Sequence, residues 1–162
     1  MSGLSRASAT IDAPAGLVWT VMTDMPAYGE WNPFILRVKR RGGPQPSVGD
    51  DILLRVRFGN GWEYDSPERI VTLDPPVAGK DGVLRALLEY EYVNWVHRYR
   101  LVRGRRAQTL TQPPGQSTVY ETWELIHGLL AFTIPNGAVT GGFRRHAAAL
   151  KQRAESLAGA AT

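Results

Sequence analysis

Hydrophobic residues recur at helical spacing near both ends of the chain. Residues 14–24 place apolar side chains three or four positions apart, which predicts a helix with a buried face made of Leu17, Val18, Val21, Met22 and Met25. Pro14 suits the first helical position, and Pro26 ends the helix. A longer stripe over residues 136–159 predicts a closing helix with apolar positions at Val139, Phe143, Ala147, Leu150, Ala154 and Leu157.

Between these helices, apolar and polar residues alternate, which is typical of half-buried strands. The alternation predicts strands over residues 5–12, 34–40, 51–58, 62–73, 83–92, 94–112 and 117–128. Glycines within 59–61 predict a tight hairpin, and residues 74–82 predict a turn. Gly104 predicts a bulge, and Pro67 predicts either a bulge or a sheet edge. Because short turns join consecutive strands, we expect an antiparallel sheet that the closing helix covers.

The alternation also predicts which side chains face the interior. The expected inner positions are Phe34, Leu36, Leu54, Val56, Phe58, Trp62, Tyr64, Leu88, Tyr90, Trp95, His97, Tyr99 and Phe143. The last strand is amphipathic in neither register, because its first face carries Tyr120, Thr122, Glu124 and Ile126 and its second carries Val119, Glu121, Trp123, Leu125 and His127. Its inner face stays unassigned, since a slip of one residue exchanges the two faces.

The connector at residues 23–34, "TDMPAYGEWNPF", contains three aromatic residues within seven positions. Its length allows one short helical turn around "AYGEW" before the next strand. We expect Trp31 and Phe34 to point inward and Tyr28 to lie nearer the opening of any cavity. The connector is then either an end wall or a gate.

Composition narrows the class of protein. The chain has 162 residues and no cysteine, which predicts one domain over residues 1–162 without disulfides or thiolate metal sites. No leader-like or membrane-spanning run is evident, so a cytoplasmic protein is expected. The net charge of +4 comes from arginine-rich stretches at 37–41, 103–106 and 144–145. Such stretches can bind nucleic acid, but their mixture with Asp and Glu favours solvated faces and no nucleic-acid partner.

Several segments resemble a known family. The segment at residues 11–34 follows the pattern of an apolar residue, "APxxxVW", an aspartate, an aromatic residue and "WNP", through Ile11, Ala13, Pro14, Val18, Trp19, Asp24, Tyr28, Trp31, Asn32 and Pro33. The segments "YETWELIHGLLAF" and "GFRRHAAALKQRAE" are similar to the family's last strand, with Gly128 after it, and to its C-terminal helix. Across essentially its whole length, the chain resembles the START/Bet v 1-like (SRPBCC) superfamily, in its polyketide cyclase/dehydrase and lipid-transport group.

The resemblance implies an α+β helix-grip fold. In this fold a curved seven-stranded antiparallel sheet wraps around a long C-terminal helix, two short helices close one end, and a cavity separates sheet from helix. Family members include lipid and hormone carriers, aromatase/cyclases, oxygenase domains and chaperone co-factors, so the fold alone does not fix the function. The oxygenase subgroup binds iron through histidines and a carboxylate. His97, His127 and His146 lack that spacing, so we set this subgroup aside.

The expected inner face has the composition of a small-molecule pocket, because Tyr and Trp are frequent on it and their polar atoms need partners. A solidly packed core is the alternative. The candidate ligand-binding residues are Trp31, Phe34, Leu54, Val56, Phe58, Trp62, Tyr64, Leu88, Tyr90, Trp95, His97, Tyr99, Tyr120 and Phe143.

Candidate catalytic residues are few. His97 can act as a general acid or base, although a histidine hydrogen-bonded into the wall is the favoured interpretation; Tyr64 and Tyr99 can orient or protonate a carbonyl, although ordinary packing explains them at least as well. Glu68 and Glu124 are candidate cavity carboxylates that would need partners. His127 suits the rim at a strand end, whereas His146 suits either the cavity mouth or solvent. No nucleophile motif, phosphate-binding loop, dinucleotide fingerprint or metal-spaced cluster is present, so we expect neither a metal nor an organic cofactor.

Two functions therefore stand close together. The first is binding of a hydrophobic, aromatic or polyketide-like small molecule by a monomer or homodimer. The second is a cyclase/aromatase or dehydratase that uses acid–base chemistry in the same cavity, as a lyase or isomerase. A chaperone-co-factor-like interaction module would need an exposed apolar patch, and the sequence indicates none. The ligand, the reaction and the pathway stay open.

Overall fold

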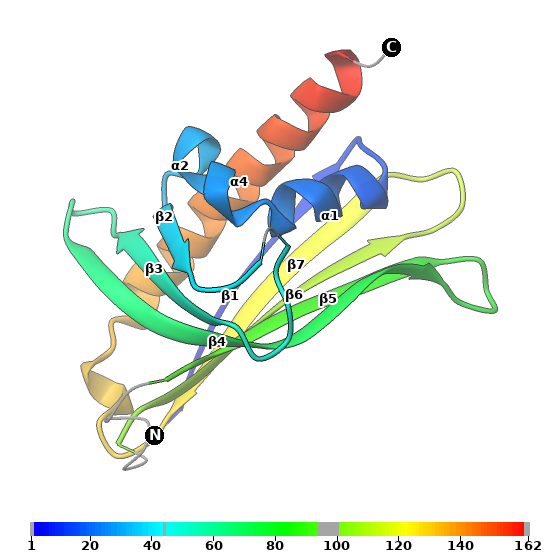
Figure 1. The fold of residues 1–162 in the computed structure, drawn as a ribbon. Helices are drawn as coiled ribbons and strands as arrows, with labels where there is room; N and C mark the ends of the chain where they lie inside the picture. Colours follow the sequence, from blue (N-terminus) through cyan, green and yellow to red (C-terminus); the bar gives the residue numbers. More distant parts are fainter. Residues whose placement is uncertain (1, 44, 94–100, 161–162) are drawn as a thin grey trace.

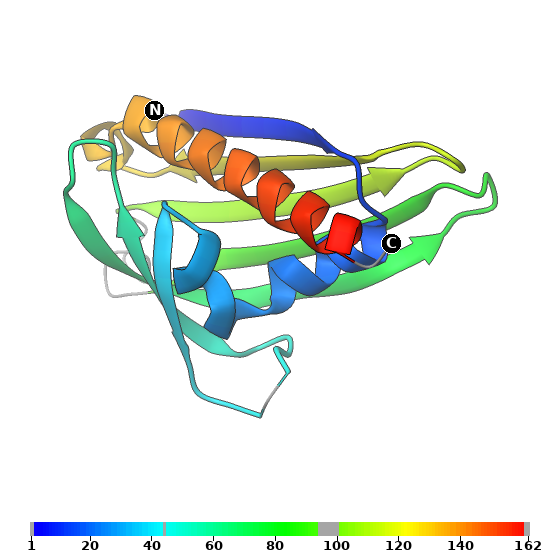
Figure 2. The same ribbon diagram turned by 90° about the horizontal axis from the view of Figure 1, so that it is seen from above.

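The computed structural model describes residues 2–43, 45–93 and 101–160, with a seven-stranded antiparallel sheet and a long C-terminal helix. The strand order is β1-β7-β6-β5-β4-β3-β2, so β1 and β2 form the edges. The sheet curves around helix α4, and α1 and α2 lie beside α4 at one end (Figures 1 and 2). This arrangement confirms the expected helix-grip fold. The strands are β1 (Ser2–Ile11), β2 (Ile35–Arg40), β3 (Asp51–Arg57), β4 (Glu63–Ala78), β5 (Leu84–Tyr92), β6 (Arg103–Gln112) and β7 (Thr118–His127).

The helices largely follow the predicted pattern. They are α1 (Ala15–Thr23), the 3-10 helix η1 (Met25–Ala27), α2 (Tyr28–Trp31), the 3-10 helix η2 (Ala131–Thr133) and α4 (Asn136–Ala160). Pro14 is not the first helical residue but the residue before it, because its backbone is extended at φ −60° and ψ 142°. The apolar stripe of α4 is buried through Ala154, whereas Leu157 is exposed. Helix α1 packs against α4, β4 and β6.

Two features of β4 differ from the prediction. Pro67 marks neither a bulge nor an edge, because it pairs in register with Leu53 and β4 lies between β3 and β5. Residues 74–82 are not one turn, because β4 continues to Ala78, which pairs with Leu84. A register shift between Asp74 and Val77 accommodates the two prolines there, and the turn is confined to the residues after Ala78.

The start of β2 also departs from simple alternation. The pairing with β3 shifts between Ile35 and Arg37, which indicates a β-bulge. Phe34 and Ile35 are consequently both buried, whereas Leu36 is only partly buried. The expected inward position of Leu36 is therefore wrong, and Ile35 takes its place.

The structure assigns the inner face of β7. Tyr120, Thr122 and Ile126 are buried, whereas Trp123 and Leu125 on the opposite face are exposed. The more polar face therefore turns inward. It can do so because Tyr120 and Thr122 form hydrogen bonds with polar side chains of β6, including Tyr120 Oη to Gln108 Oε1 at 2.8 Å.

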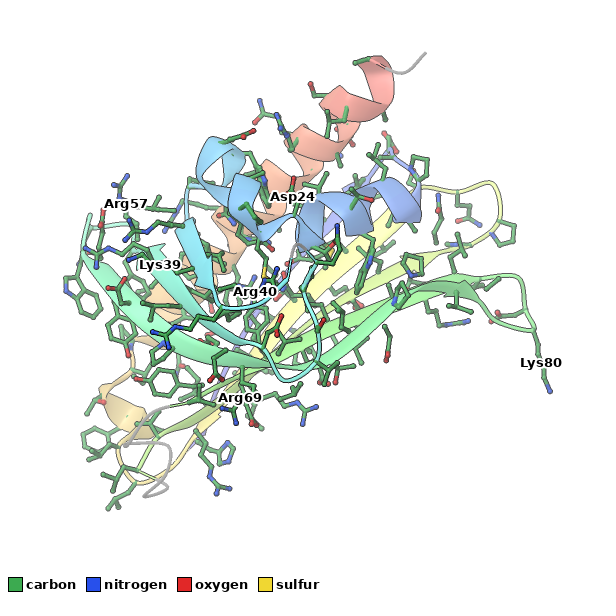
Figure 3. The ribbon with its side chains drawn as sticks, in the orientation of Figure 1. Asp24, Lys39, Arg40, Arg57, Arg69 and Lys80 are labelled. Atoms are coloured by element: carbon green, nitrogen blue, oxygen red, sulfur yellow. The ribbon has the colours of Figure 1, made fainter. Side chains whose placement is uncertain are left out.

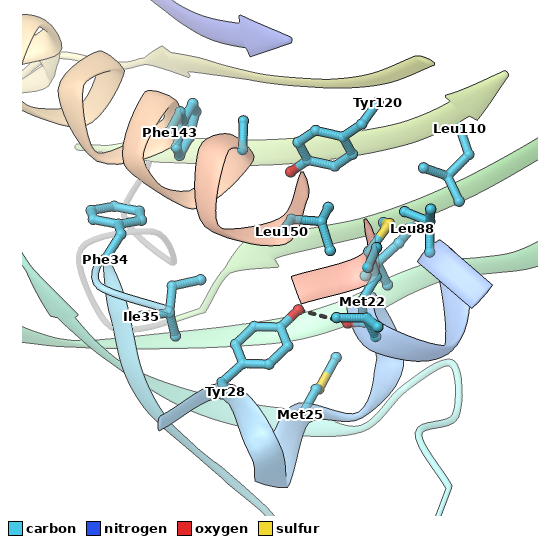
Figure 4. Close-up of a cluster of buried hydrophobic side chains, with 14 of the residues drawn as sticks. Met22, Met25, Tyr28, Phe34, Ile35, Leu88, Leu110, Tyr120, Phe143 and Leu150 are labelled. Atoms are coloured by element: carbon cyan, nitrogen blue, oxygen red, sulfur yellow. Dashed lines mark hydrogen bonds between the residues drawn. The ribbon is translucent and has the colours of Figure 1, made fainter. Parts of the chain in front are cut away.

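The buried core lies at the end of the sheet that α1 and α2 cover (Figure 4). Met22, Leu88, Leu110 and Leu150 meet there with almost no exposed surface. Tyr28 is also buried, and its hydroxyl donates a hydrogen bond to the Met22 carbonyl at 2.6 Å. The expectation that Tyr28 lies near an opening is therefore wrong, since this hydroxyl obtains its partner inside the protein.

Candidate functional site

A cavity of about 490 Å³ lies between the concave face of the sheet and the first half of α4. Its walls come from β3 through Leu54 and Val56, and from α4 through Val139 and Phe143. The cavity reaches the surface between the β3–β4 hairpin and the β7–α4 connection. There Trp62 is 55% exposed and Leu130 is 36% exposed. The cavity is therefore open at the end of the sheet opposite α1 and α2.

Five aromatic rings follow one another along the wall. Phe34 contacts Phe143 and Phe58 edge-on, with ring centroids 5.9 and 6.0 Å apart. Phe58 stacks on Trp62 at 5.3 Å with an interplanar angle of 16°, and Trp62 stacks on Tyr64 at 5.9 Å. The rings thus form a continuous aromatic wall from the rim at Trp62 to the interior at Phe143.

The structure brings eight of the candidate ligand-binding residues together around this cavity. They are Phe34, Leu54, Val56, Phe58, Trp62, Tyr64, Tyr90 and Phe143. Three further candidates, Trp95, His97 and Tyr99, lie outside the described residues, so two of the three candidate catalytic residues do as well. The third, Tyr64, lines the cavity, and its hydroxyl forms a short hydrogen bond with the Tyr92 hydroxyl.

Three candidates lie away from the cavity. Leu88 packs in the buried core. Tyr120 is fully buried behind the wall, where its hydroxyl is bonded to Gln108. Trp31 packs against Tyr28 and His146, with ring centroids 5.1 and 5.6 Å apart. Trp31 therefore does not form the predicted end wall of the cavity. Phe34 at the end of the connector and Ile35 after it line the cavity instead.

Arg106 is the most important residue that the sequence pattern missed. Its guanidinium group lines the cavity, and the residue is only 4% exposed. The group donates hydrogen bonds to Thr122 Oγ1 at 3.0 Å and to Tyr90 Oη at 3.2 Å, and it lies 4.2 Å from the centroid of the Phe143 ring. The arginine-rich stretch 103–106 had indicated a solvated face. The alternation from buried Leu110 back to Arg106 was the available signal for an inward position.

Two carboxyl groups share the wall with Arg106. Glu68 is buried, and Glu124 is half-buried with its carboxyl group lining the cavity. Burial, reinforced by the charge of Glu124, raises the pKa of Glu68 to about 8, although a hydrogen bond from Ser66 at 2.7 Å opposes this rise. Burial also raises the pKa of Glu124 above its ordinary value, and Arg106 opposes it. At neutral pH the Glu68 carboxyl is therefore mainly protonated and can donate a hydrogen bond into the cavity.

A second polar cluster lies behind the cavity wall. Asn32 Oδ1 accepts hydrogen bonds from the backbone nitrogens of Phe34 and Ile35 at 3.0 and 2.9 Å. Asn32 Nδ2 donates to His146 Nδ1 at 2.8 Å, which leaves the proton of the neutral ring on Nε2. His146 is fully buried, and burial lowers its pKa well below the usual value. It therefore lies neither at the mouth nor in solvent, and its role is to hold the connector against α4.

The charged surface forms local pairs rather than one stripe. Arg55 pairs with Glu63 at 2.9 Å, and Arg69 pairs with Asp51 at 2.8 Å. The labelled side chains Arg57 on β3, Arg69 on β4 and Lys80 in the turn between β4 and β5 lie apart from one another (Figure 3). In the arginine-rich stretches, Arg37, Lys39, Arg41 and Arg144 are exposed as the sequence predicted, whereas Arg106 is buried.

Apart from Trp62 at the cavity rim and single residues such as Val48, Val77 and Leu157, exposed apolar side chains gather at two places, which the sequence did not indicate. Leu129 and Phe132 in the β7–α4 connection are 74% and 65% exposed. Leu4 pairs with Leu125 on the outer face of β1 and β7, and these residues are 57% and 46% exposed. His127 at the end of β7 is exposed. Within the described ranges, no cluster of three or more potential metal ligands occurs, and no helix is long and apolar enough to span a membrane.

Comparison with known families agrees with this architecture. Residues 4–155 match the model of the family described as polyketide cyclase/dehydrase and lipid transport. The chain belongs to this family. No curated protein sequence gives a significant match.

Several solved structures share this fold. The di-domain ARO/CYC BexL from the BE-7585A biosynthetic pathway is 16% identical, with a TM-score of 0.67 over 95% of this chain and 50% of that chain. A point mutant of norcoclaurine synthase from Thalictrum flavum is 13% identical, with a TM-score of 0.65 over 97% and 96% of the two chains. A START superfamily protein from Mycobacterium smegmatis is 16% identical, with a TM-score of 0.61 over 96% and 99%. The chain described here spans about half the length of BexL.

Proposed function

We propose that this protein binds a hydrophobic, ring-bearing small molecule in the cavity between the sheet and α4. The observation that carries the proposal is the aromatic wall that runs from Trp62 to Phe143 inside a largely apolar cavity. A volume of about 490 Å³ falls within the range of small-molecule sites, which are mostly apolar with a few convergent polar groups. Family membership agrees with this proposal, because the family includes lipid-transport proteins.

Native mass spectrometry of the freshly purified protein, followed by titration with the neutral probe 2-naphthamide, tests this function. We expect a bound small molecule in the purified protein or saturable binding of the probe. Val139→Trp fills the cavity and should abolish either signal, whereas Val119→Trp on the outer face of β7 should not. Absence of both signals in the correctly folded wild-type protein would refute the proposal.

A second candidate is a polyketide cyclase/aromatase or dehydratase activity in the same cavity. The observation that favours it is the protonated Glu68 carboxyl near the Arg106 guanidinium in an apolar enclosure. In an aldol cyclisation, an enol carbon of the substrate attacks a carbonyl carbon. As the new carbon–carbon bond forms and the carbonyl π bond breaks, Glu68 would donate its proton to the developing alkoxide, and Arg106 would stabilise that negative charge. The enol hydroxyl would release its proton to solvent as it becomes a ketone, and Glu68 would take up a proton again. Loss of water from the resulting alcohol would complete a dehydration. The di-domain ARO/CYC proteins BexL and StfQ share the fold, which makes this chemistry worth testing.

A linear poly-β-carbonyl compound is a suitable substrate for this test, because its cyclisation is followed by absorbance. We expect wild-type protein to accelerate cyclisation over the buffer rate, and Glu68→Gln to remove the acceleration while 2-naphthamide binding persists. His97, Tyr64 and Tyr99 stay alternative catalytic candidates, and alanine variants of each belong in the same assay. Equal rates with wild-type protein and buffer would refute the enzymatic function and leave the binding function standing.

The location, the oligomeric state and the partners of the protein are also proposals. We propose a cytoplasmic protein that acts as a monomer or homodimer without a nucleic-acid partner. The locally paired arginines support the absence of nucleic-acid binding. A chaperone-co-factor-like role is the weakest candidate. Its support is the exposed apolar side chains at Leu4 and Leu125 and at Leu129 and Phe132.

A further inference from the structure

The inner part of the cavity wall carries a buried positive charge. Arg106 lies in a row of cross-strand neighbours, between Tyr90 on β5 and Glu124 on β7. An arginine remains protonated under all ordinary conditions, even when it is buried. Removing such a charge from water is costly unless an opposite charge and hydrogen bonds compensate for it.

The protein does not supply that opposite charge by direct contact. Glu124 is the register partner of Arg106, yet the two side chains form no ion pair within the described part of the chain. The Arg106 guanidinium instead turns towards Thr122 and Tyr90 and packs over Phe143. The Glu124 carboxyl occupies the space above Gly104, where an added Cβ would lie 2.8 Å from Glu124 Oε1. The absence of a side chain at Gly104 therefore allows Glu124 to stay apart from Arg106.

The hydrogen bonds of Arg106 leave donors available. A guanidinium group has five N–H donors in a fixed planar fork. Nε is bonded to Thr122, and Nη1 is bonded to the Tyr90 hydroxyl. Nη2 has only a long contact of 3.5 Å to Gln108 Oε1. The remaining N–H groups are suited to an oxygen anion, because charge-assisted hydrogen bonds of this kind are the strong ones.

We propose that the ligand of this cavity is an organic acid whose negatively charged oxygen binds Arg106 while its rings pack along the aromatic wall. A carboxylate or a ring-conjugated enolate or phenolate has the required chemistry. This inference rests on the proposed binding function and names its ligand class. Glu68, which is mainly protonated at neutral pH, provides a hydrogen-bond donor beside the same anion, and both Glu68 and Glu124 repel the anion when they are ionised.

The cavity therefore couples anion binding to protons. The groups that face Arg106 are Glu68 on β4, Tyr90 on β5, Glu124 and Tyr120 on β7, Tyr28 on α2 and His146 on α4. Burial raises the pKa of each tyrosine and lowers that of His146, so these groups stay neutral between pH 6.5 and 9. Glu68, with a pKa of about 8, changes its charge within that interval. The affinity for an anion should fall as the pH rises through the pKa of Glu68, because the ionised Glu68 carboxylate then compensates the charge of Arg106.

Isothermal titration with 2-naphthoate and its neutral isostere 2-naphthamide tests this inference. We expect wild-type protein at pH 6.5 to bind the acid about tenfold or more tightly than the amide, because a charge-assisted hydrogen bond is worth roughly 1.5–3 kcal/mol. Arg106→Gln should remove this preference with little change for the amide, and Arg106→Lys should keep part of it. The matched control is Arg105→Gln on the outer face, where Arg105 pairs with Glu89, and it should change neither affinity.

Raising the pH to about 9 should weaken 2-naphthoate binding several-fold in wild-type protein but not in Glu68→Gln. Equal affinity of wild-type protein for acid and amide would overturn the inference and leave the proposed function intact. Binding of neither probe, in a chain that folds normally by circular dichroism, would count against both. If Arg106→Gln does not fold, the acid–amide comparison and the pH profile of Glu68→Gln still decide the question.

Discussion

Asn32 connects the cavity wall to α4, and its removal should therefore be costly. The side chain is 3% exposed and makes three hydrogen bonds, to the backbone nitrogens of Phe34 and Ile35 and to His146 Nδ1. Asn32→Ala leaves two buried backbone donors and one buried ring acceptor without partners. Each such group costs about 1–3 kcal/mol, so the three together should lower the free energy of unfolding by at least about 3 kcal/mol.

Urea unfolding followed by circular dichroism measures this loss, and Asn60→Ala is the matched control. Asn60 also accepts a hydrogen bond from a backbone nitrogen, that of Trp62 at 3.0 Å, but at an exposed hairpin. Its replacement should cost no more than about 1 kcal/mol, because water replaces the lost partner. Phe34 and Ile35 both line the cavity, so Asn32→Ala should also weaken 2-naphthamide binding. A loss no larger than that of Asn60→Ala would refute the assignment of Asn32 as the link between wall and helix.

Two further predictions concern packing and protonation. Gly141→Ala in α4 should stabilise the protein by about 0.5–1 kcal/mol, because alanine favours a helix over glycine and nothing crowds the added Cβ. Gly142→Ala should destabilise the protein, because the added Cβ overlaps the Phe34 ring. Equal shifts of the two variants in thermal unfolding would contradict this packing. Between about pH 5 and 7.5 the folded chain holds a proton on Glu68 that the unfolded chain has lost, so this carboxyl lowers the stability of wild-type protein as the pH rises. In urea unfolding, the stability of Glu68→Gln should therefore rise relative to wild-type protein by about 1.4 kcal/mol per pH unit. A difference that does not depend on pH would contradict the raised pKa of Glu68.

Local periodicity was sufficient to predict much of the fold and part of the wall. Val56, Tyr64 and Phe143 follow regular alternation or a helical stripe, and each faces the cavity. Both signals are short-range, since the side-chain direction depends only on the backbone repeat. The family resemblance supplied the curvature of the sheet around the C-terminal helix and the cavity between them, which alternation alone does not specify.

The remaining errors come from contacts between distant residues. The bulge after Ile35 depends on pairing with β3, so it is not visible in the alternation of β2 alone. The inward face of β7 depends on Gln108 and Arg106, which bond Tyr120 and Thr122 from another strand. His146 was expected at the cavity mouth or in solvent, because its partner, Asn32, lies 114 residues earlier in the chain and is not visible in the local pattern. A polar residue can be assigned to the interior only when such partners are known.

Methyl-resolved NMR during titration with 2-naphthamide tests the central claim most directly, because it locates the bound molecule. Leu54, Val56 and Val139 line the cavity, whereas Leu4, Val119 and Leu125 lie exposed on the outer face of β1 and β7. We predict saturable shifts of the first three methyl sets with the second three unchanged. Shifts confined to the outer face, or no shifts at saturating probe, would contradict a ligand-binding cavity between the sheet and α4.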